Sequence, residues 1–92
     1  MIQFLVHDEK DSVGVATVDI QAESVAHGLT MDTQRKLEVR VVQPIPLGHK
    51  VALKPLRAGD TVIEYGHDIG KVVAPIELGQ HVHVHNLKTK RW

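Results

Sequence analysis

The most informative absence in this 92-residue chain is that of cysteine. Without cysteine there is no disulfide framework, no thiolate metal site and no cysteine nucleophile. Aromatic residues are also scarce, at 3 % of the chain. Neither charge predominates, since Lys plus Arg and Asp plus Glu both number 11, which argues against a general nucleic-acid-binding protein with a basic surface. A chain of this length forms one domain at most, with a small buried core.

The beginning of the chain lacks the features of a targeting or membrane segment. The stretch MIQFLVHDEKD has no cationic region, and its apolar run is far shorter than a signal peptide or a membrane span requires. We therefore expect a cytoplasmic protein with no membrane partner and, from its balanced charge, no nucleic-acid partner.

Valine is abundant, and it occurs in short runs separated by seven glycines and four prolines. Such β-branched runs interrupted by Gly and Pro predict an all-β fold of many short strands joined by tight turns. We expect strands at residues 3–6, 13–20, 37–42, 51–54, 61–64, 71–73 and 81–85. Residues 21–36 are mostly polar and small, and here we expect a long loop.

One template occurs three times, in segments 44–51, 55–62 and 75–82. Proline stands first, an aliphatic residue second, glycine fifth and valine eighth. The template predicts a turn followed by a strand, because proline presets the entry and glycine adopts the left-handed conformation before the strand begins. The aliphatic residue is expected to anchor the turn in the core. These positions can be purely architectural.

The segment HVHVHN, residues 81–86, contains three of the seven histidines. On a strand, alternate residues share a face, so His81, His83 and His85 would form a row while Val82 and Val84 enter the core. Imidazoles spaced in this way can converge on a metal ion or transfer protons. Alternatively, the row is a solvated strand face. No carboxylate lies beside it, so a metal site here would be incomplete without a partner chain or domain.

Cationic residues elsewhere are weaker candidates. His49 and Lys50 follow a glycine turn at a strand entry, where side chains often line a cleft, although an exposed turn pair is the simpler interpretation. Lys88, Lys90 and Arg91 near the C-terminus could hold an anionic substrate or dock on an acidic surface, or simply be solvated. The final residue, Trp92, is a large apolar ring that is expected to pack against something.

Three ordered motifs together resemble the SAF domain of the altronate/galactarate dehydratase family. They are the GHK segment at 48–50, the YGxxIG turn at 65–70 and the HxHN ending at 83–86. The resemblance covers about residues 1–87, and residues 88–92 remain as a basic C-terminal tail. It implies a small β-clip structure that works beside a much larger catalytic dehydratase-like domain or subunit.

The resemblance also implies a chemistry, which is β-elimination next to a carboxylate with a divalent metal, usually Fe²⁺. Carried over by motif, His83 and His85 become the expected catalytic and metal-binding residues. The expected substrate-binding residues are Asn86, His49, Lys50 and, in the tail, Lys88. His81 lies outside the family pattern, which argues against a role for it.

Within the family, the ending VHNLKTKRW on a small chain resembles the small subunits of lyases that eliminate sulfite from sulfolactate and leave pyruvate. The substrate would then be a small anionic hydroxy acid. One alternative is the small subunit or N-terminal domain of a sugar-acid dehydratase, which loses water instead. A second alternative is a non-catalytic SAF module that binds a ligand or a partner.

Overall fold

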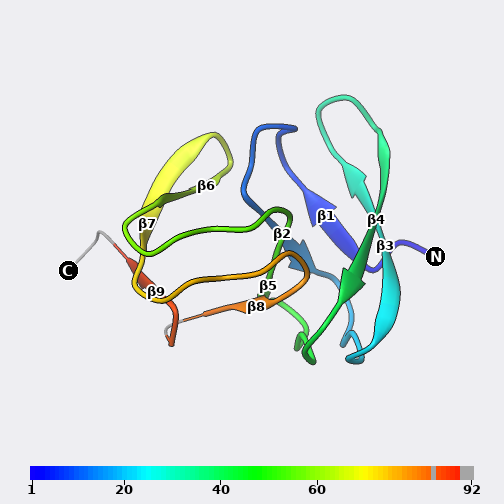
Figure 1. Ribbon diagram of the computed structural model, residues 1–92. Helices are drawn as coiled ribbons and strands as arrows, with labels where there is room; N and C mark the ends of the chain where they lie inside the picture. Colours follow the sequence, from blue (N-terminus) through cyan, green and yellow to red (C-terminus); the bar gives the residue numbers. More distant parts are fainter. Residues whose placement is uncertain (84, 90–92) are drawn as a thin grey trace.

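The computed structural model describes residues 1–83 and 85–89, and this part of the chain folds into short strands without a helix (Figure 1). The all-β prediction is therefore confirmed. No helix in the described part of the chain could cross a membrane. The strands are β1 Phe4–Val6, β2 Val13–Ala16, β3 Ser24–Thr30, β4 Lys36–Val41, β5 Lys50–Ala52, β6 Thr61–Glu64, β7 His67–Val72, β8 His81–Val82 and β9 Leu87–Thr89.

The strands form two sheets, which lie on the right and the left of Figure 1. The larger sheet has the order β4-β3-β1-β2-β5-β8, and the smaller one has the order β6-β7-β9. β1 pairs with β3 in parallel, whereas the other neighbouring strands in the described chain pair antiparallel. The short strands β5 and β8 form the end of the larger sheet that lies toward the smaller sheet (Figure 1).

Two separate hydrophobic cores hold the sheets together. The first is built around Phe4 and the second around residues of β6 and β7. β5 contributes to both, because successive strand residues point to opposite faces and Val51 enters the first core while Ala52 enters the second. The strand β5 therefore runs between the two cores.

The three-fold repeated template has the predicted structure. The aliphatic second residues Ile45, Leu56 and Ile76 are all buried, with at most 4 % of each exposed. The glycines at the fifth position have left-handed φ angles of 83–94°, and the eighth-position valines are fully buried. Each of these glycines also donates its N–H to a strand carbonyl, at Ala16, Val72 and Ala52 respectively.

A fourth copy of the same turn occurs at residues 19–26, where sequence comparison did not show it. Ile20 takes the second position and is buried, and Glu23 takes the fifth with a φ of 60°. Glu23 donates its N–H to Val41, as the glycines of the other copies do to their strands. The prediction of a long loop over residues 21–36 is therefore wrong, because this turn leads directly into β3.

The four turns associate in two pairs, one for each core. Ile20 and Ile45 exchange two backbone hydrogen bonds of 2.9 Å, and Leu56 and Ile76 exchange two of 2.8 Å. The buried second and eighth residues of the first pair all belong to the first core, and those of the second pair all belong to the second core. The domain thus consists of two similar halves joined along β5.

The predicted strand at 81–85 is too long. β8 ends at Val82, and a turn follows in which the N–H groups of Asn86 and Leu87 both donate to the carbonyl of His83. Val82 is buried as expected, whereas Val84 lies outside the described residues. The strand predicted at 13–20 is also too long, since β2 ends at Ala16, and the strand predicted at 71–73 begins earlier, at His67.

A buried carboxylate ties the turn between β6 and β7 to the loop between β1 and β2. Asp11 is 5 % exposed, and its two oxygens accept the N–H groups of Tyr65 at 2.9 Å and Gly66 at 3.0 Å. Tyr65 has a left-handed φ of 56°, which is strained for a residue with a side chain. Asp11 offsets that strain by accepting both N–H groups of the turn.

We expect Asp11→Ala to lower the free energy of unfolding by about 3 kcal/mol, because it leaves the N–H groups of Tyr65, Gly66 and Asp8 without their charged acceptor. Asp11→Asn keeps one acceptor oxygen and should lose about half as much. Urea denaturation measures both values. The matched control is Asp60→Ala, since Asp60 also accepts a backbone N–H, from Arg57 at 2.8 Å, but in an exposed turn. An Asp11→Ala protein no less stable than Asp60→Ala would contradict this role.

Candidate functional site

The pairing of β5 with β8 brings three histidines to one face of the larger sheet. Lys50 is in register with Val82, and Val51 with His81. Continuing this register places His49 opposite His83. Because Val82 is buried in the second core, its neighbours His81 and His83 point to the other face of the strand.

The imidazoles of His49, His81 and His83, which we call the three-histidine cluster, lie in direct contact. Nδ1 of His49 is 2.8 Å from Nε2 of His81, so one ring donates a hydrogen bond and the other accepts it. The ring centroids of His49 and His83 are 4.3 Å apart with 24° between the planes, and those of His81 and His83 are 5.5 Å apart. His83 is exposed, and the other two rings are half-buried.

The surroundings favour the neutral form of two of these rings. Burial lowers the pKa of His81 below its ordinary value, and the neighbouring histidines His49, His85 and His83 lower it further. The pKa of the exposed His83 is lowered too, by a partial loss of hydration and by the charges of His49, Lys50 and His85. A neutral imidazole offers a nitrogen lone pair, which is the form that binds a metal.

The donor atoms of the cluster fit a divalent metal ion. One nitrogen from each of the three rings can be chosen so that all lie within 4.8 Å of one another. Since metal–nitrogen bonds are ~2.0–2.1 Å long, the three atoms would have to move closer together to surround one ion. His49, His81 and His83 are therefore the residues of the described chain that could hold a metal here.

This grouping differs from the predicted pair of ligands, His83 and His85. His83 belongs to the cluster, but His85 lies in the following turn and is exposed, with its ring 5.4 Å from that of His81. His81, which the family pattern had set aside, is a central member, and His49 joins it. The GHK motif had singled out His49, but as a substrate-binding residue and not as a neighbour of His81.

Asn86, predicted to bind substrate, uses both ends of its side chain inside the protein. Its Oδ1 accepts the N–H of His83 at 2.9 Å, and its Nδ2 donates to the carbonyl of His81 at 2.8 Å. Only 2 % of the residue is exposed. Asn86 thus positions two members of the cluster. Gln43, which the sequence did not single out, accepts the N–H of His81 at 3.0 Å.

The two predicted lysines lie in different places. Lys50 is half-buried on β5, and its charge lowers the pKa of His83 and opposes the rise that burial causes in the pKa of Glu64. Lys88 is exposed on β9, in register with Lys71 in the smaller sheet, and is not part of the cluster. Lys90, Arg91 and Trp92 lie outside the described residues.

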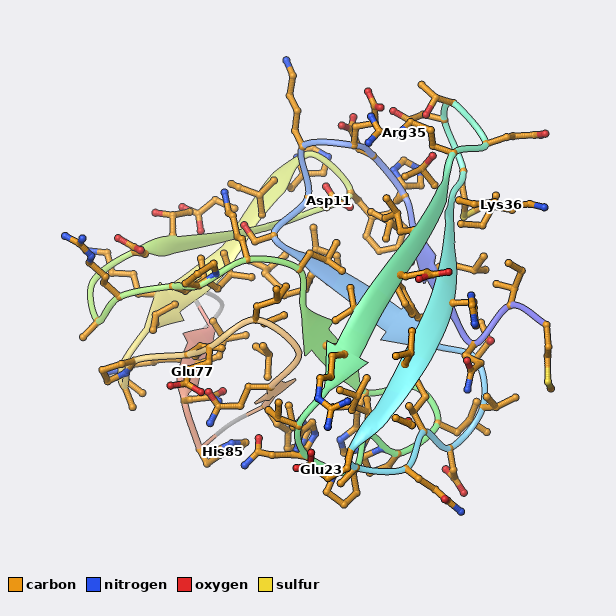
Figure 2. All side chains as sticks on the ribbon, turned by 45° about the vertical axis from the view of Figure 1, so that its right-hand side comes forward. Asp11, Glu23, Arg35, Lys36, Glu77 and His85 are labelled. Atoms are coloured by element: carbon orange, nitrogen blue, oxygen red, sulfur yellow. The ribbon has the colours of Figure 1, made fainter. Side chains whose placement is uncertain are left out.

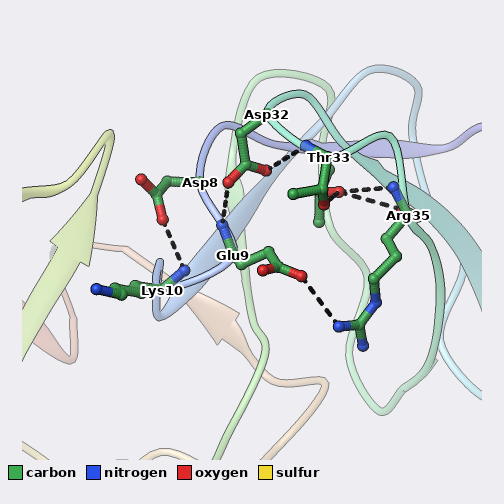
Figure 3. A network of polar contacts seen from close by, with 7 residues as sticks. Asp8, Glu9, Lys10, Asp32, Thr33 and Arg35 are labelled. Carbon is green, nitrogen blue, oxygen red and sulfur yellow. Dashed lines mark hydrogen bonds and ion pairs between the residues drawn. The ribbon is translucent and has the colours of Figure 1, made fainter.

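A cleft with a volume of about 580 Å³ lies away from the histidines. Figure 2 shows Asp11 and Arg35, which line it, at the end of the molecule opposite His85. Arg35 pairs with Glu9 at 3.0 Å, and Glu9 donates its N–H to Asp32 at 3.2 Å (Figure 3). These charged groups pair with one another and connect the β1–β2 loop to the β3–β4 turn, which indicates a structural role. We place the functional site at the histidines, where three possible ligand atoms lie together.

Comparison with known proteins gives a family for the whole domain. Residues 2–90 match the altronate/galactarate dehydratase SAF domain. The chain is 50 % identical over 92 residues to (2R)-sulfolactate sulfo-lyase subunit alpha of Chromohalobacter salexigens, covering 99 % of this chain and 98 % of that protein. A 48-residue segment is 71 % identical to the protein of the same name from Paracoccus pantotrophus, covering 52 % of this chain and 72 % of the relative.

Altronate dehydratase of Bacillus subtilis is 34 % identical over 89 residues, which is 97 % of this chain but 17 % of that much longer protein. The chain therefore belongs to the altronate/galactarate dehydratase SAF domain family. The resemblance seen in its GHK, YGxxIG and HxHN motifs is confirmed.

We expect Asn86→Ala to weaken binding of Zn²⁺, used as a probe, by about 10-fold, because groups that orient metal ligands typically contribute that much. Isothermal titration of the folded chain measures the affinity. The matched control is Gln3→Ala, since Gln3 also accepts the backbone N–H of a histidine, His27, at 3.0 Å, but away from the cluster. Equal zinc affinity in Asn86→Ala and Gln3→Ala would show that Asn86 does not position the cluster.

Proposed function

We propose that this chain is the small (alpha) subunit of a carbon–sulfur lyase that eliminates sulfite from (2R)-3-sulfolactate to give pyruvate. The observation that carries the proposal is the 50 % identity to a sulfo-lyase alpha subunit along nearly the full length of both chains. The name of that relative implies a partner subunit. We propose a larger dehydratase-like subunit as the partner and the cytoplasm as the location.

A second candidate is the small subunit or N-terminal domain of a sugar-acid dehydratase. It is favoured by the altronate dehydratases of Bacillus subtilis and Escherichia coli, which are 34 % and 38 % identical to nearly all of this chain. Because the chain matches only 17 % of each of those proteins, their similarity supports the SAF domain more than the dehydration of a particular sugar acid. A non-catalytic SAF module is the third candidate, and the three-histidine cluster argues against it.

We propose a divalent metal, Fe²⁺, as the cofactor, with His49, His81 and His83 as its ligands in this chain. The support is chemical, because three nitrogen donors converge and two of their rings have lowered pKa values. A bound divalent ion acts as a Lewis acid that polarises a substrate oxygen and stabilises developing negative charge.

The reaction removes the proton from C2 of sulfolactate and breaks the bond from C3 to sulfur, and sulfite leaves with the bonding electrons. The enol that remains gains a proton at C3 and loses its hydroxyl proton, which gives pyruvate. His85 is exposed beside the cluster and is not one of its three ligands, so we assign it to proton transfer. The positive charge of Lys50 favours an anionic substrate near His83, and Lys88 stays a prediction for anion binding.

The test is to co-express this chain with the large subunit and to compare sulfite release from sulfolactate with dehydration of altronate and galactarate. We expect sulfite release in the complex and no turnover by the chain alone, because its cluster lacks further ligands and a carboxylate base. Dehydration of altronate without sulfite release would favour the second candidate, and activity of the isolated chain would refute the two-subunit proposal.

In the active complex, we expect His81→Ala to reduce kcat by at least about 100-fold, in line with the loss of a metal ligand or of its orientation. The matched control is His27→Ala. His27 is exposed on β3 and lies 3.6 Å from Glu38, far along the sheet from the cluster. We expect the control to keep nearly full activity, and equal losses in both variants would exclude a specific role for the cluster.

A further inference from the structure

The three-histidine cluster contains one kind of donor. All three of its ligand atoms are imidazole nitrogens, and no carboxylate of the described chain belongs to the group. Affinity of nitrogen sites for divalent metals rises from iron through cobalt and nickel, and zinc also binds imidazole well. Sites that hold Fe²⁺ with histidines commonly add a carboxylate. The donors of this chain alone therefore favour metals other than iron.

The charge around the cluster points to an anionic fourth ligand. Lys50 is paired with Val82 and shares its face of the sheet, opposite to the cluster, but its positive charge still acts on His83, whose pKa it lowers. A divalent ion held by three neutral rings within the field of this lysine would leave an uncompensated positive charge. An anion on the open side of the ion would be attracted by both the metal and the lysine.

The position of the open side fits the same conclusion. His83 is exposed, whereas His49 and His81 are half-buried, so the cluster faces solvent on the side of His83. The side chain of Asn86 already uses both of its polar ends in hydrogen bonds with the backbone of His81 and His83, so it is not a free ligand. His85, whose ring lies 5.4 Å from that of His81, could add only another nitrogen, so a carboxylate ligand has to come from outside this group of residues.

We propose that the cluster by itself is a zinc or nickel site, and that a carboxylate from outside the chain fills its open position and makes it suit iron. The proposal deepens the proposed function and rests on the same three ligands. The carboxylate can belong to a side chain of the partner subunit or to the hydroxy-acid substrate, and the test separates these two sources.

The first experiment is anaerobic competition of Zn²⁺, Ni²⁺ and Fe²⁺ for the isolated chain. We expect zinc and nickel to bind at least about 10-fold more tightly than iron, as the donor set dictates. His49→Gln should abolish this preference together with binding, whereas His27→Gln should change neither. Iron binding as tight as zinc, or zinc binding that survives His49→Gln, would overturn the proposal.

The second experiment follows the visible spectrum of the Co²⁺-loaded chain while acetate is added as a carboxylate probe. We expect acetate to shift the cobalt bands. Lys50→Gln should tighten Co²⁺ binding about 3- to 6-fold and weaken acetate binding, because one charge has opposite effects on a cation and an anion. An unchanged spectrum, or equal acetate affinity in Lys50→Gln and wild type, would overturn the open anion position.

The source of the carboxylate is found by replacing acetate with either the large subunit or sulfolactate. A spectral shift with the subunit alone assigns the ligand to the partner, and a shift only when sulfolactate is added assigns it to the substrate. A shift with neither overturns the proposal. Because these are binding measurements, they hold even if the complex turns over altronate and not sulfolactate, so failure of the proposed reaction is seen separately.

Discussion

The antiparallel pairing of β5 with β8 is the contact on which the rest of the structure depends. It joins the two halves of the domain, since β5 belongs to the first pair of turns and β8 to the second. The burial of Val51 in one core and Val82 in the other fixes which way each strand faces. Since Val82 faces the second core, His81 and His83 lie on the opposite face of the sheet. The register of the strands places His49 on that same face.

Much of the fold could be predicted from the sequence because one turn recurs three times with the same residue types at its key positions. Pro and Gly have strong backbone preferences, so the template at 44–51, 55–62 and 75–82 predicts its own structure. The copy at 19–26 has Asp19 in place of proline and Glu23 in place of glycine. There the pairing of Ile20 with Ile45 and the contact of Glu23 with Val41 impose the turn, and these interactions are not local.

The site was only half visible in the sequence for a similar reason. Alternation of histidine with valine identified His83 and placed Val82 in the core, but His49 joins from a segment 32 residues away from His81. The turn at His83 also depends on Asn86, whose side chain reaches back to the strand it follows. A pattern within one strand cannot show such a cross-strand group, or tell a ligand from the residue that orients it.

The division into two halves has a consequence for the energetics of the whole domain. His49 comes from one half of the domain, and His81 and His83 come from the other. An ion bound by all three would therefore cross-link the two halves. A ligand that binds the folded domain and not the unfolded chain raises the free energy of unfolding. Metal binding to the cluster and the association of the two halves would therefore be coupled, and the free energy of unfolding of this small domain would rise with the metal concentration.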